Sequence, residues 1–320
     1  MRTTQSFPPG KVPASSPSNP SAGRRPLITG AVLALMLLVG LAVVRSRWPS
    51  PPPSLGEPVA FLELTRGSVQ VVPPSGGQDP SRLLALGAGE PIHAGSTIDT
   101  GAAAGDTAGR AALRLANGAS LRLDHDSRVQ IASGGTIELE RGAVYVDSKL
   151  SSAVEVRTTF GVVRDIGTQF EVRLLDADAT ADSAVLRVRV REGEVVLERD
   201  GASHGASAGA QLILRGEEVS RGTSPVWGAE WAWVLEAAVA PEIDGRPLTD
   251  FLDWAVREGG WTLRYADDAT AALAAETRLN GDARGLTVEE AAALVLRGSG
   301  LDFRIEEGEL VVTAGEPEGR

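Results

Sequence analysis

The sequence predicts a mainly β protein, in which an all-β sandwich or barrel is followed by a compact α+β unit and preceded by a membrane-spanning helix. From Phe61 to about Glu218, short segments alternate apolar and polar residues, and a glycine interrupts them every ten residues or so. This pattern is typical of antiparallel strands. Past Gly222 the apolar residues follow a helical repeat instead, and a long uncharged apolar run lies near the N-terminus.

That apolar run, Leu27 to Val44, contains 18 residues without a charge, and arginines flank it on both sides. At a rise of about 1.5 Å per residue it spans roughly 27 Å, close to the ~30 Å hydrocarbon core of a bilayer. A cleaved signal peptide is the alternative. The run is longer than the apolar region of most such peptides, and residues 41–44 contain no small-residue cleavage site. The sequence therefore favours a transmembrane helix at 27–44 that anchors an extracytoplasmic protein.

The segments beside the span have low-complexity compositions. Residues 1–26 are rich in Pro, Ser, Thr and Gly, which predicts a disordered cytoplasmic tail because such a segment has too little apolar surface to bury. The proline run in 45–58 predicts a stiff stalk that lifts the next domain off the bilayer. The last residues, 315–320, predict a second short disordered tail.

The charge of the chain limits its partners. Six of the 31 basic residues and none of the 42 acidic residues precede Glu57, so the remainder has a net charge of −17. A segment this acidic is not expected to bind nucleic-acid phosphates or anionic lipid surfaces. Because the chain has no cysteine, it has no disulfide, thiolate nucleophile or zinc–sulfur site.

The registers of two hairpins in the predicted β domain, residues 59–222, can be tested by one requirement. Residues that face each other across the two strands should be both apolar or both polar. A three-residue loop ending at Gly118 pairs Leu113 with Leu121, whereas a two-residue loop puts apolar opposite polar residues. By the same test, the strand of Leu186–Arg191 folds back through Glu192-Gly193. That register sets Val190 opposite Val195, Val188 opposite Leu197, Arg191 opposite Glu194 and Arg187 opposite Glu198.

The predicted C-terminal domain, residues 243–314, follows a Trp-rich linker at 223–242. A helix is expected from Leu248 to Val256, where apolar residues repeat at i, i+3, i+4, i+7 and i+8 after Pro247 and before Gly259-Gly260. A second helix should begin with the capping box of Thr287 and Glu290 and end at Arg297-Gly298. Strands are expected at Trp261–Tyr265, near Leu279, and in a hairpin with Ile305 opposite Leu310 and Phe303 opposite Val312. The predicted order is β-α-β-β-α-β-β.

The β segment resembles the FecR-like family of envelope regulators over about 150 residues. The fragments that carry the resemblance are Arg66-Gly67-Ser68-Val69, Gly89-Glu90-Pro91-Ile92, Ala112-Leu113-Arg114-Leu115, Asn117-Gly118, Gly142-Ala143-Val144-Tyr145-Val146, Gly167-Thr168-Gln169-Phe170-Glu171-Val172, Val188 to Val196 and Gly216-Glu217. The C-terminal unit is similar to the short N-terminal domain of secretins and TonB-dependent receptors.

The resemblance implies an antiparallel, jelly-roll-like periplasmic β-sandwich, a single inner-membrane span and control of a sigma factor. Related regulators carry a cytoplasmic helical domain that binds the sigma factor, whereas only 26 residues of Pro/Ser-rich tail precede the span here. Control of a sigma factor therefore requires that this tail folds on binding or that a separate subunit acts. An outer-membrane receptor or a secretin-type component is the protein partner that the resemblance implies.

Six residues are candidate structural or interface positions rather than catalytic ones. In the β domain, Gly167 allows a tight bend, Thr168 follows it, and Phe170 fills the core. In the linker, the indoles of Trp227, Trp231 and Trp233 can form a seam between the two domains or, if exposed, stack on sugar rings.

Three other groups of polar residues have ordinary structural explanations. The cluster Asp124-His125-Asp126-Ser127 contains the side chains of a catalytic relay, but adjacency in sequence is not convergence in space, so a solvated loop or strand end is expected. The arginines Arg187, Arg189 and Arg191 are expected on a solvated strand face, paired with Glu194 and Glu198. No catalytic residue, metal ligand or cofactor site is expected, since His93 and His204 have no histidine three to five residues away.

The sequence therefore favours a non-enzymatic envelope protein that acts by protein–protein contact, in signalling or as a scaffold. Strand addition or helix packing is the expected mode of contact. A glycan- or cell-wall-binding module is the alternative, based on the tryptophans and on the many predicted loops that carry hydroxyl groups. A hydrolase is a third hypothesis, based on Asp124 to Ser127 alone.

Overall fold

The computed structural model of the chain describes residues 56–74, 87–101, 108–148, 151–165, 167–175 and 184–315. All of these residues belong to one compact unit, Pro53–Arg320. The predicted tail, the predicted span and most of the predicted stalk lie outside the described residues. Within the described part of the chain, no helix combines the length and apolar character needed to cross a membrane.

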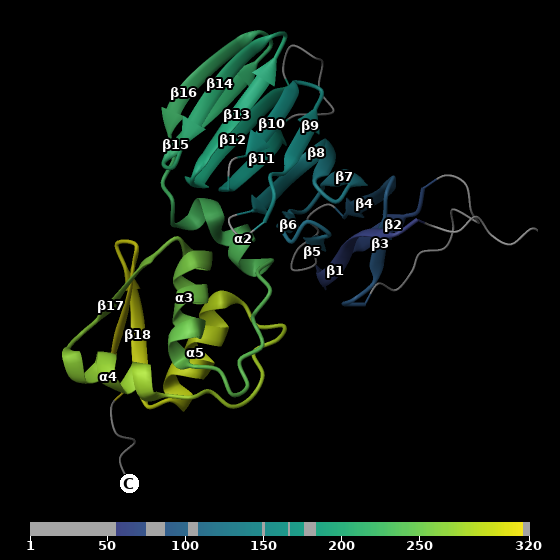
Figure 1. Ribbon diagram of the computed structural model, residues 1–320. Coiled ribbons are helices and arrows are strands. Elements are labelled where there is room, and N and C mark those ends of the chain that lie inside the picture. The colour runs from purple at the N-terminus through teal and green to yellow at the C-terminus, as the bar shows by residue number, and fades with distance from the viewer. Residues whose placement is uncertain are drawn as a thin grey trace, which may run out of the picture. The chain divides into compact units, whose positions relative to one another are not determined.

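Sixteen strands form the N-terminal part of the described chain, which is mainly β as the sequence predicted (Figure 1). They are β1 (Pro58–Arg66), β2 (Val69–Val72), β3 (Pro91–His93), β4 (Ser96–Thr100), β5 (Arg110–Leu115), β6 (Ser120–Leu123), β7 (Arg128–Ser133), β8 (Thr136–Asp147), β9 (Glu155–Thr158), β10 (Gly161–Asp165), β11 (Gln169–Leu175), β12 (Val185–Glu192), β13 (Glu194–Arg199), β14 (Ala202–Ser207), β15 (Ala210–Arg215) and β16 (Glu218–Thr223).

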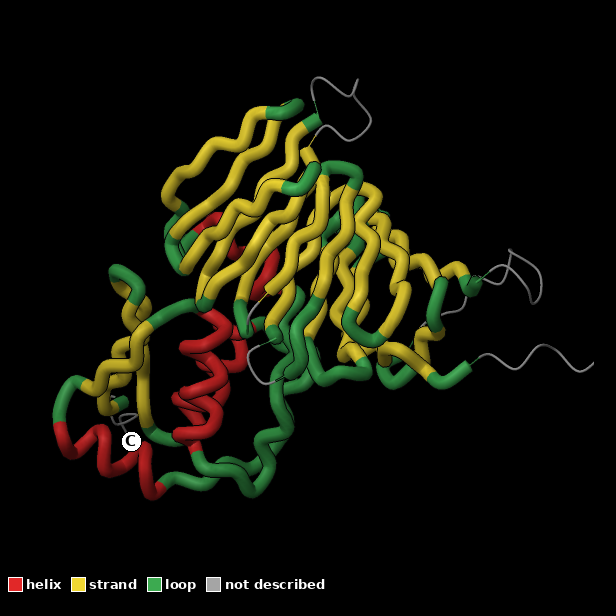
Figure 2. Tube along the Cα trace, turned by 45° about the horizontal axis from the view of Figure 1, so that its top comes forward, coloured by secondary structure: helices red, strands yellow, loops and turns green. Residues whose placement is uncertain are grey.

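The strands form two sheets that are continuous with each other, as the yellow array in Figure 2 shows. The first sheet has the order β3-β1-β5-β6-β8-β11-β12-β15-β16, and the second has the order β2-β4-β7-β8-β9-β10-β13-β14. Among the described strands of these two sheets, only β8 and β9 pair in parallel. Buried apolar side chains of both sheets meet in one core, for example Leu113 and Val188 from the first sheet and Val129 and Leu197 from the second.

Strand β8 belongs to both sheets. Its first half pairs with β7 and β9 in the second sheet, and its second half pairs with β6 and β11 in the first. The change occurs near Gly142, whose φ is +80°. A Cβ atom at this position would collide with Ser127. The bend therefore requires glycine for two reasons, the positive φ and the close approach of Ser127.

The hairpin of β5 and β6 has the predicted register. Leu113 pairs with Leu121, and the amide of Leu115 donates to the carbonyl of Ala119. Gly118 has the positive φ, +93°, that the three-residue loop requires. Local phase matching was therefore sufficient to predict this hairpin.

Replacing Gly118 with alanine is expected to lower the free energy of unfolding by about 1–2 kcal/mol, because an L residue is strained at this φ. The space around Gly118 is open enough for a methyl group, so backbone strain accounts for the effect. The matched control is Gly298→Ala, at a helix end with no positive φ and nothing within 4 Å of the added carbon. It should change stability by less than ~0.5 kcal/mol in the same urea titration. Equal effects of the two substitutions would contradict this account.

The predicted hairpin of β12 and β13 is wrong. Strand β12 pairs with β11 and β15 in the first sheet, whereas β13 pairs with β10 and β14 in the second. The chain crosses between the sheets at Gly193, which has a φ of +81°. Val188, Val190, Val195 and Leu197 all face the common core, but from opposite sheets. The comparison of facing residues could not distinguish a hairpin within one sheet from a crossing between two sheets, because both arrangements bury the same residues.

The C-terminal part of the described chain contains the helices and a three-stranded sheet with the order β17-β19-β18 (Figure 1). Its elements are the 3-10 helix η2 (Ala229–Trp231), the helices α2 (Ala232–Glu236), α3 (Leu248–Gly259), α4 (Asp268–Glu276) and α5 (Val288–Gly298), and the strands β17 (Thr262–Tyr265), β18 (Leu301–Glu306) and β19 (Glu309–Ala314). The apolar faces of α3 and α5 pack on the sheet around Phe251, Leu296 and Leu310.

Both predicted helices are confirmed, with the predicted ends. Helix α3 follows Pro247 and ends at Gly260, which has a left-handed conformation. Helix α5 begins with the complete capping box of Thr287 and Glu290. The hairpin of β18 and β19 is also confirmed, with Ile305 opposite Leu310 and Phe303 opposite Val312.

The predicted order of elements is wrong in three places. It begins with a strand, whereas the described chain has no strand between α2 and α3. No strand forms near Leu279, where the structure has an isolated bridge between Pro247 and Arg278. Helix α4 precedes this bridge and was not predicted, because only Thr270 and Ala274 of its nine residues are buried and no apolar stripe marks it. It is instead held at its start by the side chain of Asp267, which accepts from the amide of Thr270.

Candidate functional site

The outer face of the first sheet carries a row of charged residues that the alternation of strands places together. Along β11 and β12, Phe170, Val172, Val188 and Val190 face the core, so the residues between them point to the other side. Direct pairing across four strands aligns Arg122, Tyr145, Glu171 and Arg189. We call the face formed by Arg122, Tyr145, Glu171, Arg173, Arg187, Arg189 and Arg191 the arginine face.

Glu171 lies at the centre of the arginine face and is fully buried. Its carboxylate accepts from Arg189 at 2.8 Å, contacts Arg173 at 3.0 Å, and accepts from the indole of Trp233 at 3.2 Å. Arg187 is a fourth partner, at 3.3 Å. Burial alone would raise the pKa of Glu171, but the positive charges of Arg173 and Arg189 outweigh it and hold the pKa below its ordinary value.

The predicted solvation of Asp124 to Ser127 is wrong for two of the four residues. Asp124 is 2 % exposed and pairs with Arg173 at 2.7 Å and Arg110 at 3.2 Å. Burial would raise the pKa of Asp124, but the hydrogen bond and charge of Arg173 lower it overall. Ser127 is buried, and its hydroxyl donates to backbone carbonyls, those of Ala143 at 3.0 Å and His125 at 3.4 Å, rather than to the imidazole that a relay would require. This cluster therefore has structural partners.

Two tryptophans cover the arginine face. Trp231 is fully buried, meets Tyr145 edge to face at 6.0 Å, and lies under the guanidinium groups of Arg189 and Arg191 at 4.6 and 5.0 Å from its ring centroid. Trp233 is 7 % exposed, with Arg173 5.6 Å from its ring centroid. These contacts combine apolar burial with cation–π attraction.

Trp227 differs from the other two tryptophans, because 40 % of its surface is exposed. Its ring lies close to Gly308, where a Cβ atom would collide with it. The structure thus places one indole at the β17–β19 sheet and two on the β domain. The interpretation of all three as a seam stays a prediction.

Helices α2 and α3 attach the C-terminal unit to this face (Figure 1). Arg122, which is 2 % exposed, forms a bidentate ion pair with Glu258 of α3, with N–O distances of 2.7 and 2.8 Å. It also donates to the carbonyl of Val234 in α2 at 3.0 Å. Next to Glu258, Arg257 pairs with Asp147 of β8 and with Glu192 of β12 at 3.0 Å. Buried charge pairs therefore hold the two parts together.

The expectation of a solvated arginine row is wrong for Arg189 and Arg191, whereas Arg187 is half-buried. Arg189 and Arg191 are each 4 % exposed, and their partners are Glu171, Trp231 and the carbonyls of Glu230 and Val226 at 2.9 and 2.7 Å. Glu194 and Glu198, the expected partners, are on β13 in the other sheet. Arg189 and Arg191 are buried because residues 224–234 fold back over them. The alternation of residues along a strand does not reveal that another segment covers its outer face. The tryptophans just after β16 are the sequence feature that could have indicated this burial.

Gly167, Thr168 and Phe170 lie at the beginning of β11. Gly167 has a φ of +68°, and Phe170 is fully buried in the core. The hydroxyl of Thr168 donates to the buried carboxylate of Asp165 at 3.2 Å, and its amide donates to the hydroxyl of Ser148 at 3.0 Å. Ser148 also bonds Asp165. These contacts tie the start of β11 to the ends of β8 and β10, and a functional role for the three residues stays a prediction.

In the described ranges, no group of three or more His, Cys, Asp or Glu residues is arranged to hold a metal ion. Burial raises the pKa of the Tyr145 hydroxyl to about 12, against the opposing charges of Arg191 and Arg122, so this group stays protonated at neutral pH. The arrangement of the arginine face is suited to joining two parts of the described chain.

The arginine face is expected to make the fold sensitive to acid. Glu171 and Asp124 have folded-state pKa values below their ordinary values of 4.5 and 3.8. Their contribution to stability is therefore present above those ordinary values and is lost as the pH falls through the lower, folded-state values. Urea midpoints should be similar at pH 7 and 6 and should fall steeply between pH 5 and 3.

A Glu171→Gln variant is the comparison for this pH dependence. It lacks one of the two carboxylates, so it should start from a lower stability at pH 7 and lose less of it on acidification. Parallel pH profiles for the variant and the unchanged chain would show that Glu171 has no part in the acid sensitivity.

Comparison with known proteins gives one family match. Residues 96–196 match the model of the family described as FecR protein. This range contains β4 to β12, the row from Arg122 to Arg189, and the start of β13.

Two crystal structures of a candidate anti-sigma factor from Parabacteroides distasonis ATCC 8503 are also similar to this chain. Each has 15% sequence identity and a TM-score of 0.35, and the similarity covers 69% of this chain and 99% of the other. The search of curated proteins found no match. The family match covers less than half of the chain, so the chain is similar to FecR proteins over residues 96–196.

Proposed function

We propose that this chain is a membrane-anchored FecR-type regulator that works by protein–protein contact in the cell envelope. The observation that carries the proposal is the FecR match over residues 96–196, which contain most of the first sheet and the arginine face. The predicted span at 27–44 would hold the described domains on the periplasmic side of the inner membrane. The residues before it would face the cytoplasm, where a sigma factor is a candidate partner.

The way the two described parts are joined supports a contact role. Arg122 and Glu258, more than 130 positions apart in the chain, form a buried two-pronged ion pair, and Trp231 and Trp233 fill the space beside it. Breaking such a pair is costly, so the β domain and the C-terminal unit are expected to move together. A rigid pair of domains can transmit the docking of a partner on one domain to the other.

Two of the three linker tryptophans no longer favour the glycan-binding alternative. Trp231 and Trp233 are buried against the arginine face, so their rings are not available to stack on sugars. A partner protein in the envelope, such as an outer-membrane receptor or a secretin-type component, fits the proposal better. The groups of Asp124 to Ser127 are likewise engaged in structural contacts.

The test is a strain that lacks the chain, complemented with three forms of it. We expect loss of the chain to change transcription of a discrete set of genes, and the full-length form to restore the pattern. A form whose residues 27–44 are replaced by a cleavable export signal should be released from the membrane fraction and should not restore it. A form carrying Asp250→Ala, an exposed change on α3, is the matched control and should restore it fully.

An unchanged transcript profile in the deletion strain, under conditions in which the chain is produced, would overturn the regulatory proposal. Recovery of the full-length form in the soluble fraction, with its N-terminus uncut, would overturn the membrane anchor. The two outcomes are independent of each other.

A further inference from the structure

Strand β14 is an edge strand without the usual protection. Among the described strands it pairs only with β13, and its residues, Ala202 to Ser207, include no charge and no proline. Natural edge strands are normally protected by charges, proline or bulges, because an open edge can pair with another strand. The edge strand β16 at the same end of the other sheet carries Glu218 and Arg221, and β3 begins with Pro91.

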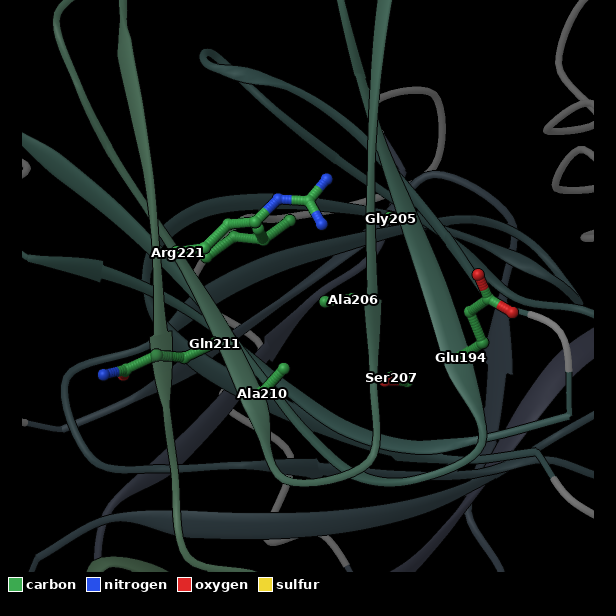
Figure 3. Close-up of a pocket in the computed structure, with 8 residues that line it drawn as sticks. Glu194, Gly205, Ala206, Ser207, Ala210, Gln211 and Arg221 are labelled. Carbon is green, nitrogen blue, oxygen red and sulfur yellow. The ribbon is translucent and has the colours of Figure 1, made fainter.

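A cavity of about 240 Å³ lies between β14 and the end of the first sheet (Figure 3). Its walls come from the two sheets, and the residues that line it are Glu194, Gly205, Ala206, Ser207, Ala210, Gln211, Leu212 and Arg221. Figure 3 shows the alanines between the side chains of Arg221 on one strand and Glu194 on another. The cavity therefore opens the sandwich beside an unprotected edge.

On the core-facing side, this opening is lined by apolar residues of β14 and β15 and by a charged residue of β16. Ala206 pairs with the buried Val195, and Arg221 pairs with the buried Leu212, so both lie on the core-facing side of their strands. Arg221 forms no ion pair with any described residue, although the chain is acidic. An apolar floor at Ala206 and Leu212 with a free guanidinium at its side calls for a ligand that is aliphatic and carries a carboxylate.

We propose that an extended segment of another protein adds to β14 as a further strand, with aliphatic side chains at alternate positions in the cavity and a carboxylate paired with Arg221. This inference rests on the proposed contact function and identifies the edge of β14 as the surface through which the partner is contacted. Backbone hydrogen bonds to β14 supply affinity, and the cavity supplies specificity. A second copy of β14 does not supply these groups, because its own inward residues, Ala202, His204 and Ala206, include no aliphatic side chain larger than alanine and no carboxylate.

The proposal is tested by selecting peptides from a displayed library of random dodecapeptides against the full-length chain in detergent. We expect enrichment of sequences with aliphatic residues at every second position, a nearby Asp or Glu, and no proline. Addition of a saturating selected peptide should slow hydrogen exchange of the β14 amides and leave exchange in β17–β19 unchanged.

Three variants of the chain define the binding site. Ser203→Lys places a charge on the edge, Ala210→Leu fills the cavity, and Arg221→Glu reverses the charge, so each should weaken binding by at least about tenfold (1.4 kcal/mol). The matched control is Ser220→Lys, an exposed serine on the protected edge β16, which should stay within about twofold of the unchanged chain. Urea midpoints of all four should match that of the unchanged chain, which shows that they are folded.

Several results would overturn the proposal: no selected peptide, equal binding to the Ser203→Lys and Ser220→Lys variants, or no slowing of exchange in β14. A dimer in sedimentation that Ser203→Lys abolishes would identify a second copy as the occupant and would also overturn it. Failure of the transcription test with intact peptide binding would reject the regulatory function and leave the strand site standing.

Discussion

Replacement of Glu171 by alanine is expected to lower the free energy of unfolding by about 3–5 kcal/mol, the range seen when one partner of a buried ion pair is removed. The substitution leaves Arg173, Arg187 and Arg189 close together without the carboxylate between them, and the indole of Trp233 loses its acceptor. Arg189 is 4 % exposed, so water cannot replace the lost charge. Urea or guanidinium denaturation followed by far-UV circular dichroism measures the change.

The control for this prediction is Glu140→Ala in β8, since Glu140 also pairs with an arginine, Arg128, at 2.8 Å. Both side chains of that pair are exposed, by 52% and 38%, so its loss should cost less than ~1 kcal/mol. If Glu171→Ala were as stable as Glu140→Ala, the central position of Glu171 in the arginine face would be refuted.

Replacement of Glu258 by alanine should have an effect of similar size, about 3–5 kcal/mol, and should also loosen the C-terminal unit. Arg122, which is 2 % exposed, would keep only the carbonyl of Val234 and the ring of Tyr145, 5.4 Å away, as its partners. Burial lowers the pKa of Arg122, whereas the charge and hydrogen bond of Glu258 raise it and outweigh burial. Arginine is not deprotonated in proteins, so removal of Glu258 leaves a buried positive charge without its carboxylate. Hydrogen exchange in β6 and α3 should therefore increase together.

Two further variants distinguish a lost ion pair from a lost side chain. Asp250→Ala removes an exposed pair from the same helix, with Arg246 at 3.8 Å, and should change stability by less than ~0.5 kcal/mol. The double variant Arg122→Met, Glu258→Leu should recover much of the stability lost in Glu258→Ala, because no unpaired buried charge is left. A double variant no more stable than the single one would show that packing, and not charge, explains the loss.

The sequence was informative where structure depends on neighbours along the chain. Gly118 fixed the loop between β5 and β6, and Pro247, Gly260, Thr287 and Glu290 fixed the ends of α3 and α5. In each case a turn or cap acts within a few residues of its signal. The same reasoning missed α4, which begins at a capping aspartate but carries no apolar stripe.

The candidate site depends on contacts that are distant in sequence, and here prediction failed. Whether Arg189 and Arg191 are solvated or buried is decided by the segment that carries Trp231, some 40 residues later. Similarly, alternation assigns Val195 to a core position but cannot say which sheet it enters from. Charged residues that alternate with valines before a Trp-rich segment could have suggested a covered face, since indoles commonly pack on guanidinium groups.

Strand β8 has a mechanical consequence. Because its first half belongs to one sheet and its second half to the other, the two sheets are joined by covalent bonds as well as by side-chain packing. A tensile load that reaches the first sheet through Arg257 and Asp147, at the end of β8, can pass along this backbone into the second sheet. The sheets cannot shear past one another unless the strand unbends at Gly142. The β domain should therefore resist extension as one rigid body.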